Sequence, residues 1–112
     1  MKRAQRLRTP AEFRRVRELA QRGWPHRLLV LYMAPNDLEQ TRVGITVSRR
    51  VGKAVVRNRI RRRLREAVRA RWARLPDSAD VVIAARPASA NASWSELTAA
   101  VDDVLSRAGI GR

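Results

Sequence analysis

Residues 42–65 read RVGITVSRRVGKAVVRNRIRRRLR, a stretch that changes from one structural period to another. Its first part alternates β-branched residues with others, which predicts a half-buried strand over residues 41–48. Its second part repeats apolar residues at helical spacing, which predicts a helix from about residue 56 to residue 71. The apolar stripe of that helix consists of Val56, Ile60, Leu64, Ala67 and Val68.

The same stretch concentrates positive charge. Residues 49–65 contain nine basic side chains in seventeen, and no acid occurs before Glu66. A solvated helix face is usually balanced by acids at helical spacing, and Glu66 alone offers that here. We therefore expect this segment to contact the phosphates of a nucleic acid. The arc opposite the apolar stripe carries Asn58, Arg61, Arg62, Arg65 and Arg69.

Composition supports the same class of partner. The 112 residues suffice for one domain, and 25 basic against 10 acidic residues give a formal net charge of +15. No apolar run is long enough to span a bilayer and no signal-peptide core is visible, so we expect a cytoplasmic protein that binds no membrane. The lack of cysteine excludes disulfides and thiolate metal sites.

The flanking segments predict one domain over residues 9–112, preceded by a basic arm over residues 1–8 that becomes ordered on binding. Thr9 and Glu12 form a capping box around Pro10, so a helix should run to about Ala20 and end before Pro25. Strands are expected over residues 27–34 and 80–86, with a shorter strand possible inside 27–34 or 41–48. A second capping box at residues 93–96 opens a helix that Gly109 should stop.

Catalytic constellations are not found. The single histidine, His26, lies beside a proline, and Asp102 and Asp103 are adjacent, so they do not share a helical face. Gly52 and Lys53 lack the further glycines of a phosphate-binding loop. We therefore expect neither catalytic residues nor metal ligands in this chain.

Residues 42–62 closely resemble the signature of the bacterial ribonuclease P protein subunit. In that family a strand ends in a basic pair and leads through Gly-Lys-Ala-Val into an Arg-Asn-Arg helix, here at residues 49–50, 52–55 and 57–59. The resemblance extends to the Thr-Pro-x-x-Phe pattern at residues 9–13 and to residues 30–32 and 81–86. It covers nearly the whole chain in the expected order.

The resemblance implies an α+β fold in a single domain with the order α-β-β-β-α-β-α. In the family, a four-stranded sheet packs with three helices, and a left-handed crossover surrounds the Arg-Asn-Arg helix, as in the second domain of ribosomal protein S5. The sequence itself does not specify that handedness, because the general rule favours right-handed crossovers.

The resemblance also implies a function. The family member joins a catalytic RNA, and this ribonuclease P holoenzyme is an endoribonuclease that removes the 5′ leader of precursor tRNA. The RNA carries the chemistry with Mg²⁺ at its active site, while the protein binds the RNA and the leader and broadens the substrates accepted. The protein needs no cofactor of its own, and whether it self-associates is left open. The alternatives are a ribosomal-type protein that only stabilises folded RNA and a sequence-specific DNA-binding protein.

The family's RNA-binding segment maps onto nine residues here: Arg49, Arg50, Lys53, Arg57, Asn58, Arg59, Arg61, Arg62 and Arg65. Asn58 can add a directional amide to this surface, or it can cap the helix start. Phe13 and Tyr32 match aromatic residues that line the family's leader cleft, where unpaired bases stack. Plain core packing is the alternative for Phe13. Arg17 occupies a position where the family often has a second aromatic, so this cleft should rely more on charge or on guanidinium–base stacking.

Overall fold

The computed structural model describes residues 2–20 and 22–109, and the order of its elements is the predicted α-β-β-β-α-β-α. Three α-helices and four strands alternate with short 3₁₀ turns, of which η2 (Arg49–Val51) and η4 (Pro87–Asn91) flank the basic helix. The helices are α1 (Pro10–Leu19), α2 (Ala54–Ala70) and α3 (Trp94–Arg107). The strands are β1 (Trp24–Pro25), β2 (Leu29–Pro35), β3 (Arg42–Val47) and β4 (Ala79–Ala85).

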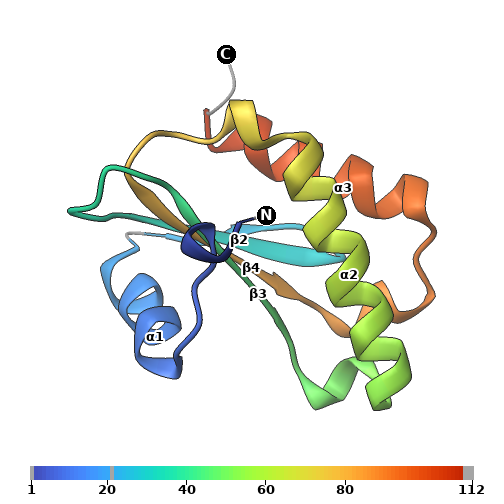
Figure 1. Ribbon diagram of the computed structural model, residues 1–112. Coiled ribbons are helices and arrows are strands. Elements are labelled where there is room, and N and C mark those ends of the chain that lie inside the picture. The colour runs from blue at the N-terminus through green and yellow to red at the C-terminus, as the bar shows by residue number, and fades with distance from the viewer. Residues whose placement is uncertain (1, 21, 110–112) are drawn as a thin grey trace.

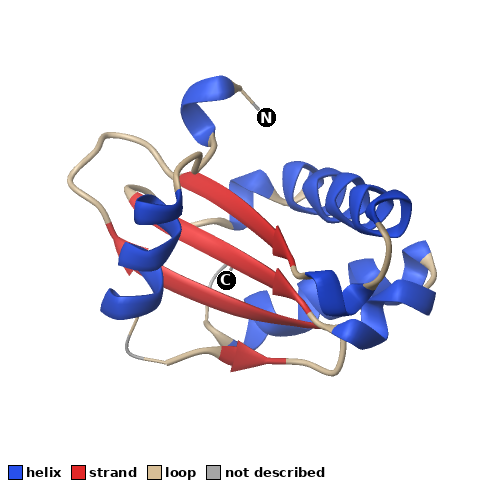
Figure 2. Ribbon diagram, turned by 90° about the horizontal axis from the view of Figure 1, so that it is seen from below, coloured by secondary structure: helices blue, strands red, loops and turns tan. Residues whose placement is uncertain are grey.

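The four strands form one mixed sheet in the order β1-β2-β4-β3. β2 runs antiparallel to β4, whereas β3 and β4 are parallel neighbours joined by α2 as a crossover. Helices α2 and α3 cover one face of the sheet, and α1 lies on the other face (Figures 1 and 2). The α+β class is therefore confirmed, while the left-handed sense of the crossover and the likeness to ribosomal protein S5 stay predictions.

The location of the short strand and the start of α2 differ from the sequence-based expectation. The short strand lies in neither suggested segment but at β1, where Trp24 pairs with Leu31 and Pro25 with Val30. Two residues are too few to show an alternating pattern, which is why they resembled a plain helix stop. Helix α2 begins at Ala54, two residues before the expected start, with Lys53 at the N-cap position.

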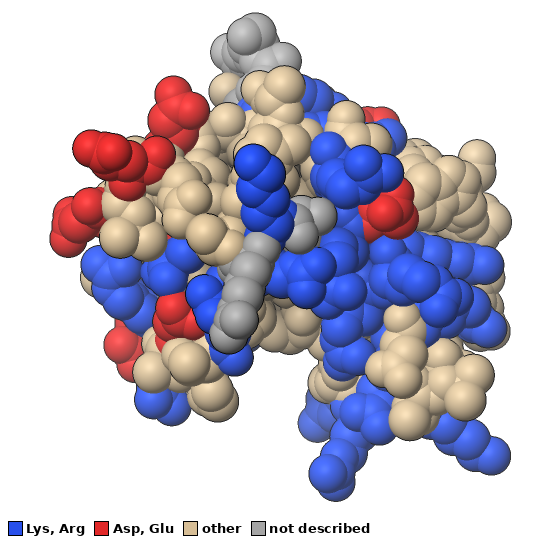
Figure 3. Space-filling view, viewed as in Figure 1, with Lys and Arg blue, Asp and Glu red and all other residues tan. Residues whose placement is uncertain are grey.

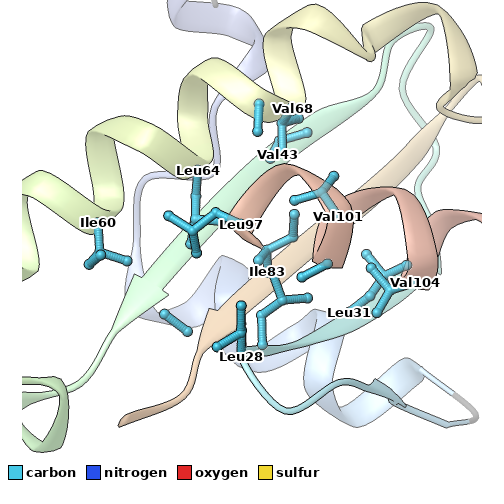
Figure 4. Close-up of a cluster of buried hydrophobic side chains, with 14 of the residues drawn as sticks. Leu28, Leu31, Val43, Ile60, Leu64, Val68, Ile83, Leu97, Val101 and Val104 are labelled. Atoms are coloured by element: carbon cyan, nitrogen blue, oxygen red, sulfur yellow. The ribbon is translucent and has the colours of Figure 1, made fainter. Parts of the chain in front are cut away.

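The main core lies between the sheet and the pair α2 and α3. Figure 4 shows side chains from both helices meeting those of the strands. The predicted stripe of α2 is confirmed at four buried positions, while Val56 is half-buried near the helix start. The buried residues of this core include Leu31, Val43, Ile60, Leu64, Val68, Ile83, Leu97, Val101 and Val104.

A network of hydrogen bonds and ion pairs attaches α1 to the sheet face opposite α2 and α3. Both predicted capping boxes are present, and in the first the Glu12 carboxylate accepts hydrogen bonds from the N–H groups of Arg8 (2.7 Å) and Thr9 (2.9 Å). Arg42 Nη1 donates to the same carboxylate at 2.6 Å. Arg42 also makes a two-pronged contact with Asp80, at 2.9 Å from Nε and 2.8 Å from Nη2. This network joins the start of α1 to β3 and β4.

Acid should weaken the attachment of α1. The N–H groups of Arg8 and Thr9, and then the positive charge of Arg42, hold the pKa of Glu12 below its ordinary value of 4.5. A carboxylate with a lowered pKa in the folded state contributes stability above its unfolded pKa and loses it as the pH falls through the folded pKa. We expect Glu12→Gln to make the free energy of unfolding less dependent on pH below about 4.5. Urea unfolding at several acidic pH values tests this, and identical pH profiles for the two proteins would contradict it.

Candidate RNA interface

Phe13 lies directly on the backbone of β3. The register places Tyr32 of β2, Val82 of β4 and Gly44 of β3 side by side in one row on the face that α1 covers. A Cβ atom at Gly44 would lie 2.3 Å and 2.4 Å from Cε1 and Cζ of Phe13, so only glycine leaves room for the ring there. Phe13 also packs against the second apolar cluster, formed by Leu7, Val16, Ala34 and Val82. The ring thus has the core contacts that its helical spacing suggested, while it remains half-buried.

The Arg17 side chain lies over Tyr32, the aromatic residue of the row on β2, β4 and β3. Its guanidinium carbon lies 4.3 Å from the centre of the Tyr32 ring, within range of a cation–π contact. Phe13 and Arg17 are four residues apart and project from one side of α1. The structure therefore brings together all three residues predicted for the leader cleft. Arg17, at the position where the family often has a second aromatic residue, places its guanidinium over Tyr32.

The sheet continues beyond α1 as a strip of small and apolar side chains. Val30, Ala84 and Thr46 form the next row across β2, β4 and β3, and all three are half-buried. This row borders the Tyr32 row on the same face. The row therefore presents small and apolar side chains beside Phe13 and Tyr32.

A hollow connects Phe13 with α2 around the outer edge of β3, where the Leu7 N–H donates to the Val43 carbonyl. Arg65 of α2 and Phe13 of α1 both line it, although the two helices pack on opposite faces of the sheet. Burial, followed by the nearby positive charges of Arg6 and Arg61, lowers the pKa of Arg65. The hollow is lined by Arg6, Leu7, Phe13, Val43, Gly44, Ile45 and Arg65.

The remaining basic residues spread along α2 and the turn before it. Figure 3 shows Lys and Arg side chains gathered over α2, while acidic side chains cluster mostly on the opposite side of that view. Glu66 pairs with Arg69 at 2.8 Å and so balances little of this charge. The exposed members of the predicted set are Arg49, Arg50, Lys53, Asn58 and Arg62, and the half-buried members are Arg57, Arg59, Arg61 and Arg65.

The structure separates the roles of two residues in the Arg-Asn-Arg triplet. Asn58 lies in the second turn of α2, so the capping alternative is wrong; its Oδ1 instead accepts a hydrogen bond from Arg61 Nη1 at 2.8 Å. Arg59 Nη2 donates to the carbonyl of Ala90 at 3.1 Å, which ties α2 to η4. Arg59 thus points partly into the protein, and Asn58 orients a neighbouring guanidinium.

Four residues of this region have no role in the site predicted from the sequence. A glycine inside a β-branched strand signals a close approach, and that signal was available at Gly44. Arg42 is the first residue of β3 and Asp80 the second of β4, yet their pairing depends on the parallel register of these two strands. The sequence predicts Arg6 only as part of a basic arm, because nothing in its sequence neighbourhood places it beside α2.

Within residues 2–20 and 22–109, no three His, Cys, Asp or Glu side chains gather in a way that could hold a metal ion. None of the helices in the described part of the chain is long and apolar enough to cross a bilayer.

The family model, the sequence relatives and the solved structures that match this chain are all ribonuclease P proteins. The family model described as Ribonuclease P matches residues 1–109. The ribonuclease P protein component of Roseiflexus castenholzii is 48% identical over 111 residues, covering 98% of this chain and 90% of the relative. That of Clostridium novyi is 37% identical over 112 residues, covering 98% of each. The solved structure of the Staphylococcus aureus RNase P protein superposes with a TM-score of 0.88 at 26% identity, covering 98% of this chain and all of that one.

Proposed function

The chain belongs to the bacterial ribonuclease P protein family and is a component of that ribonucleoprotein, and from this membership we propose how it acts. It binds the catalytic RNA through α2 and the turn before it, and it binds the 5′ leader of precursor tRNA along the sheet face beside α1. The holoenzyme then removes the leader as an endoribonuclease and gives the mature 5′ end of the tRNA. The proposed compartment is the cytoplasm.

The hollow shared by Phe13 and Arg65 carries this proposal. It links the aromatic row on the sheet to the basic helix, so one RNA strand can contact both without leaving the surface. Aromatic faces accept any base, and arginines accept any backbone phosphate. Such a surface suits leaders of varied sequence, which supports the proposed broadening of substrates.

The division of labour follows from the residues present. The RNA would supply the metal-ion chemistry through Mg²⁺ at its own active site, and this chain would supply binding. Joining a catalytic RNA to a precursor tRNA brings two polyanions together, and a chain of net charge +15 reduces their repulsion. The protein should therefore matter most when Mg²⁺ is scarce.

A binding comparison tests the leader assignment. We expect the chain in complex with its catalytic RNA to bind leader-bearing precursor tRNA more tightly than mature tRNA, at one fixed salt concentration. Catalytic RNA without the chain is the control, and there the difference should shrink. Equal gains for both tRNAs would favour the ribosomal-type alternative, in which the protein only stabilises folded RNA.

Arg17 provides a finer test of the same surface. Because its guanidinium lies over Tyr32, we expect Arg17→Ala to remove a planar stacking partner and one positive charge. Affinity for leader-bearing tRNA should fall by about 0.5–1 kcal/mol, and the salt dependence of binding should become shallower. Arg17→Phe should recover the affinity while keeping the shallower salt dependence. Titrations at several salt concentrations measure both, with Arg14→Ala, exposed on the same helix, as the control.

Two outcomes would contradict a stacking role for Arg17. If Arg17→Ala and Arg14→Ala behave alike, the position over Tyr32 has no special role. If Arg17→Phe fails to recover affinity although it folds normally, charge alone explains the contribution of Arg17.

A further inference from the structure

Helix α1 crosses the sheet from β3 towards β1. Its Phe13 ring lies against Gly44 of β3, and one turn later the Arg17 guanidinium lies over Tyr32 of β2. Figure 2 shows this helix lying across the strands. The side chains proposed to hold the leader therefore follow one another across the sheet, and the next strand beyond β2 in that direction is β1.

A second pair of a guanidinium and an aromatic ring lies at β1. The guanidinium carbon of Arg22 is 4.0 Å from the centre of the Trp24 ring, within the range of a cation–π contact. This repeats the arrangement of Arg17 over Tyr32. Trp24 pairs with Leu31 and packs against the main core, so its half-buried ring is held in place at the edge of the sheet. The edge therefore presents a second planar guanidinium supported by a ring.

Gly23 joins the two pairs. A Cβ atom at this position would lie 2.9 Å from Cε1 of Tyr32 and 3.0 Å from Cγ1 of Val30, so the backbone fits against the Tyr32 ring only without a side chain. Successive residues of a strand face opposite sides of the sheet, so the rings of Trp24 and Tyr32 lie on either side of the edge that β1 forms. A single strand that leaves Tyr32 and turns around this edge therefore meets Arg22 next.

The two stacked guanidinium groups are available to a phosphate. Among the residues that the structure describes, Glu18 included, none forms a hydrogen bond or an ion pair with the guanidinium of Arg17 or Arg22. Arg15 on the same helix instead lies 3.9 Å from Asp80. Both stacked arginines are exposed and keep their N–H donors for an anion. Each pair thus offers a plane for a base and donors for a phosphate, the two parts that one nucleotide presents.

We propose that Arg22 and Trp24 form a second nucleotide site, and that its occupant is a leader nucleotide farther from the cleavage site than the one at Tyr32. The direction follows from the other end of the path, where Phe13 shares a hollow with Arg65 of α2. Helix α2 is proposed to bind the catalytic RNA, so leader nucleotides next to the cleavage site lie at Phe13 and those nearer the 5′ end reach β1. The inference rests on the proposed function, because the strand is the leader.

Precursor tRNAs whose leaders are lengthened one nucleotide at a time test this site, with the chain bound to its cognate catalytic RNA. For the original chain we expect the affinity to rise in steps until the leader covers both sites. Arg22→Ala should weaken binding about two- to fivefold, the size of an exposed cation–π contact, and only for leaders long enough to pass Tyr32. Shorter leaders and mature tRNA should bind as they do to the original chain.

Three further variants define what the site contributes. Arg22→Lys keeps the charge without the planar group, so it should leave most of the loss for long leaders, and full recovery would overturn the stacking site. Trp24→Leu keeps an apolar side chain at the core and should reproduce the loss of Arg22→Ala. The double variant should lose no more than either single one, because both remove the same site. Arg14→Ala, exposed on α1, is the matched control and should show no loss that depends on leader length.

The site and the leader assignment fail in different ways. An Arg22→Ala loss that is equal at every leader length and for mature tRNA, or no loss at all in a chain that thermal unfolding shows to be folded, would overturn the site. The leader preference of the original chain would then still stand. If the original chain gains no affinity from a leader of any length, the proposed function itself is rejected. A loss that already appears with the shortest leaders would overturn the order of the two sites.

Discussion

Replacing Arg42 by methionine is expected to lower the free energy of unfolding by about 3–5 kcal/mol, because the buried Asp80 carboxylate loses its bidentate cation and keeps only Arg15 Nη1, at 3.9 Å. The Asp80 side chain is 1% exposed and that of Arg42 is 18% exposed. Asn36 Nδ2 remains as a donor to Asp80 at 2.8 Å, but it carries no charge. Glu12 loses a partner in the same variant, so α1 should also become less firmly attached. Chemical denaturation with a two-state fit measures the loss.

Two further variants show whether burial of Asp80 causes the loss of stability in Arg42→Met. Arg69→Met breaks an exposed pair, whose partner side chains are 58% and 52% exposed, and should change the free energy of unfolding by only about 0–1 kcal/mol. Adding Asp80→Asn to Arg42→Met should recover part of the lost stability, since the buried charge that lost its bidentate partner is then removed. A loss in Arg42→Met no greater than that in Arg69→Met would contradict the role given to this network.

The second large effect concerns Phe13. Replacing it by alanine is expected to weaken binding of leader-bearing tRNA by about 1–3 kcal/mol for each base that stacks on it, or roughly 5- to 150-fold. Mature tRNA should be affected much less. Because Phe13 also packs in the second cluster, a variant that keeps the ring is needed as well.

Gly44→Ala is that variant. Its methyl group would lie within 2.4 Å of the ring, so Phe13 must move although its chemistry is unchanged. We expect the same leader-selective loss, measured by equilibrium binding of the two tRNAs. Leu19→Ala, on an exposed part of α1, is the control and should bind both tRNAs as before. Equal losses for leader-bearing and mature tRNA in both ring variants would mean that Phe13 serves only the core.

Local signals in the sequence predicted most of the fold. The two capping boxes, at Thr9 with Glu12 and at Ser93 with Glu96, are confirmed because such motifs depend on neighbours three residues apart. The apolar stripe of α2 is confirmed at Ile60, Leu64, Ala67 and Val68, since helical spacing decides which side faces a core. These features need no knowledge of distant residues.

Features that depend on long-range placement were not predicted. The strand β1 exists because Trp24 and Pro25 pair with β2, and the buried pair of Arg42 and Asp80 requires the β3–β4 register. The position of Arg6 beside Arg65 depends on docking of the arm over almost sixty intervening residues. The family resemblance supplied Phe13 and Tyr32 as cleft residues, but the contact of Arg17 with Tyr32 needed the structure.

Cleavage of precursor tRNA by the cognate catalytic RNA, with and without this chain, tests the central claim most directly. The measurement is single-turnover cleavage at a Mg²⁺ concentration so low that the RNA alone is nearly inactive. We predict that adding the chain restores cleavage at the mature 5′ end, and that Phe13→Ala restores it less well. A chain that binds the RNA but leaves the cleavage rate unchanged would contradict its role as the protein component of ribonuclease P.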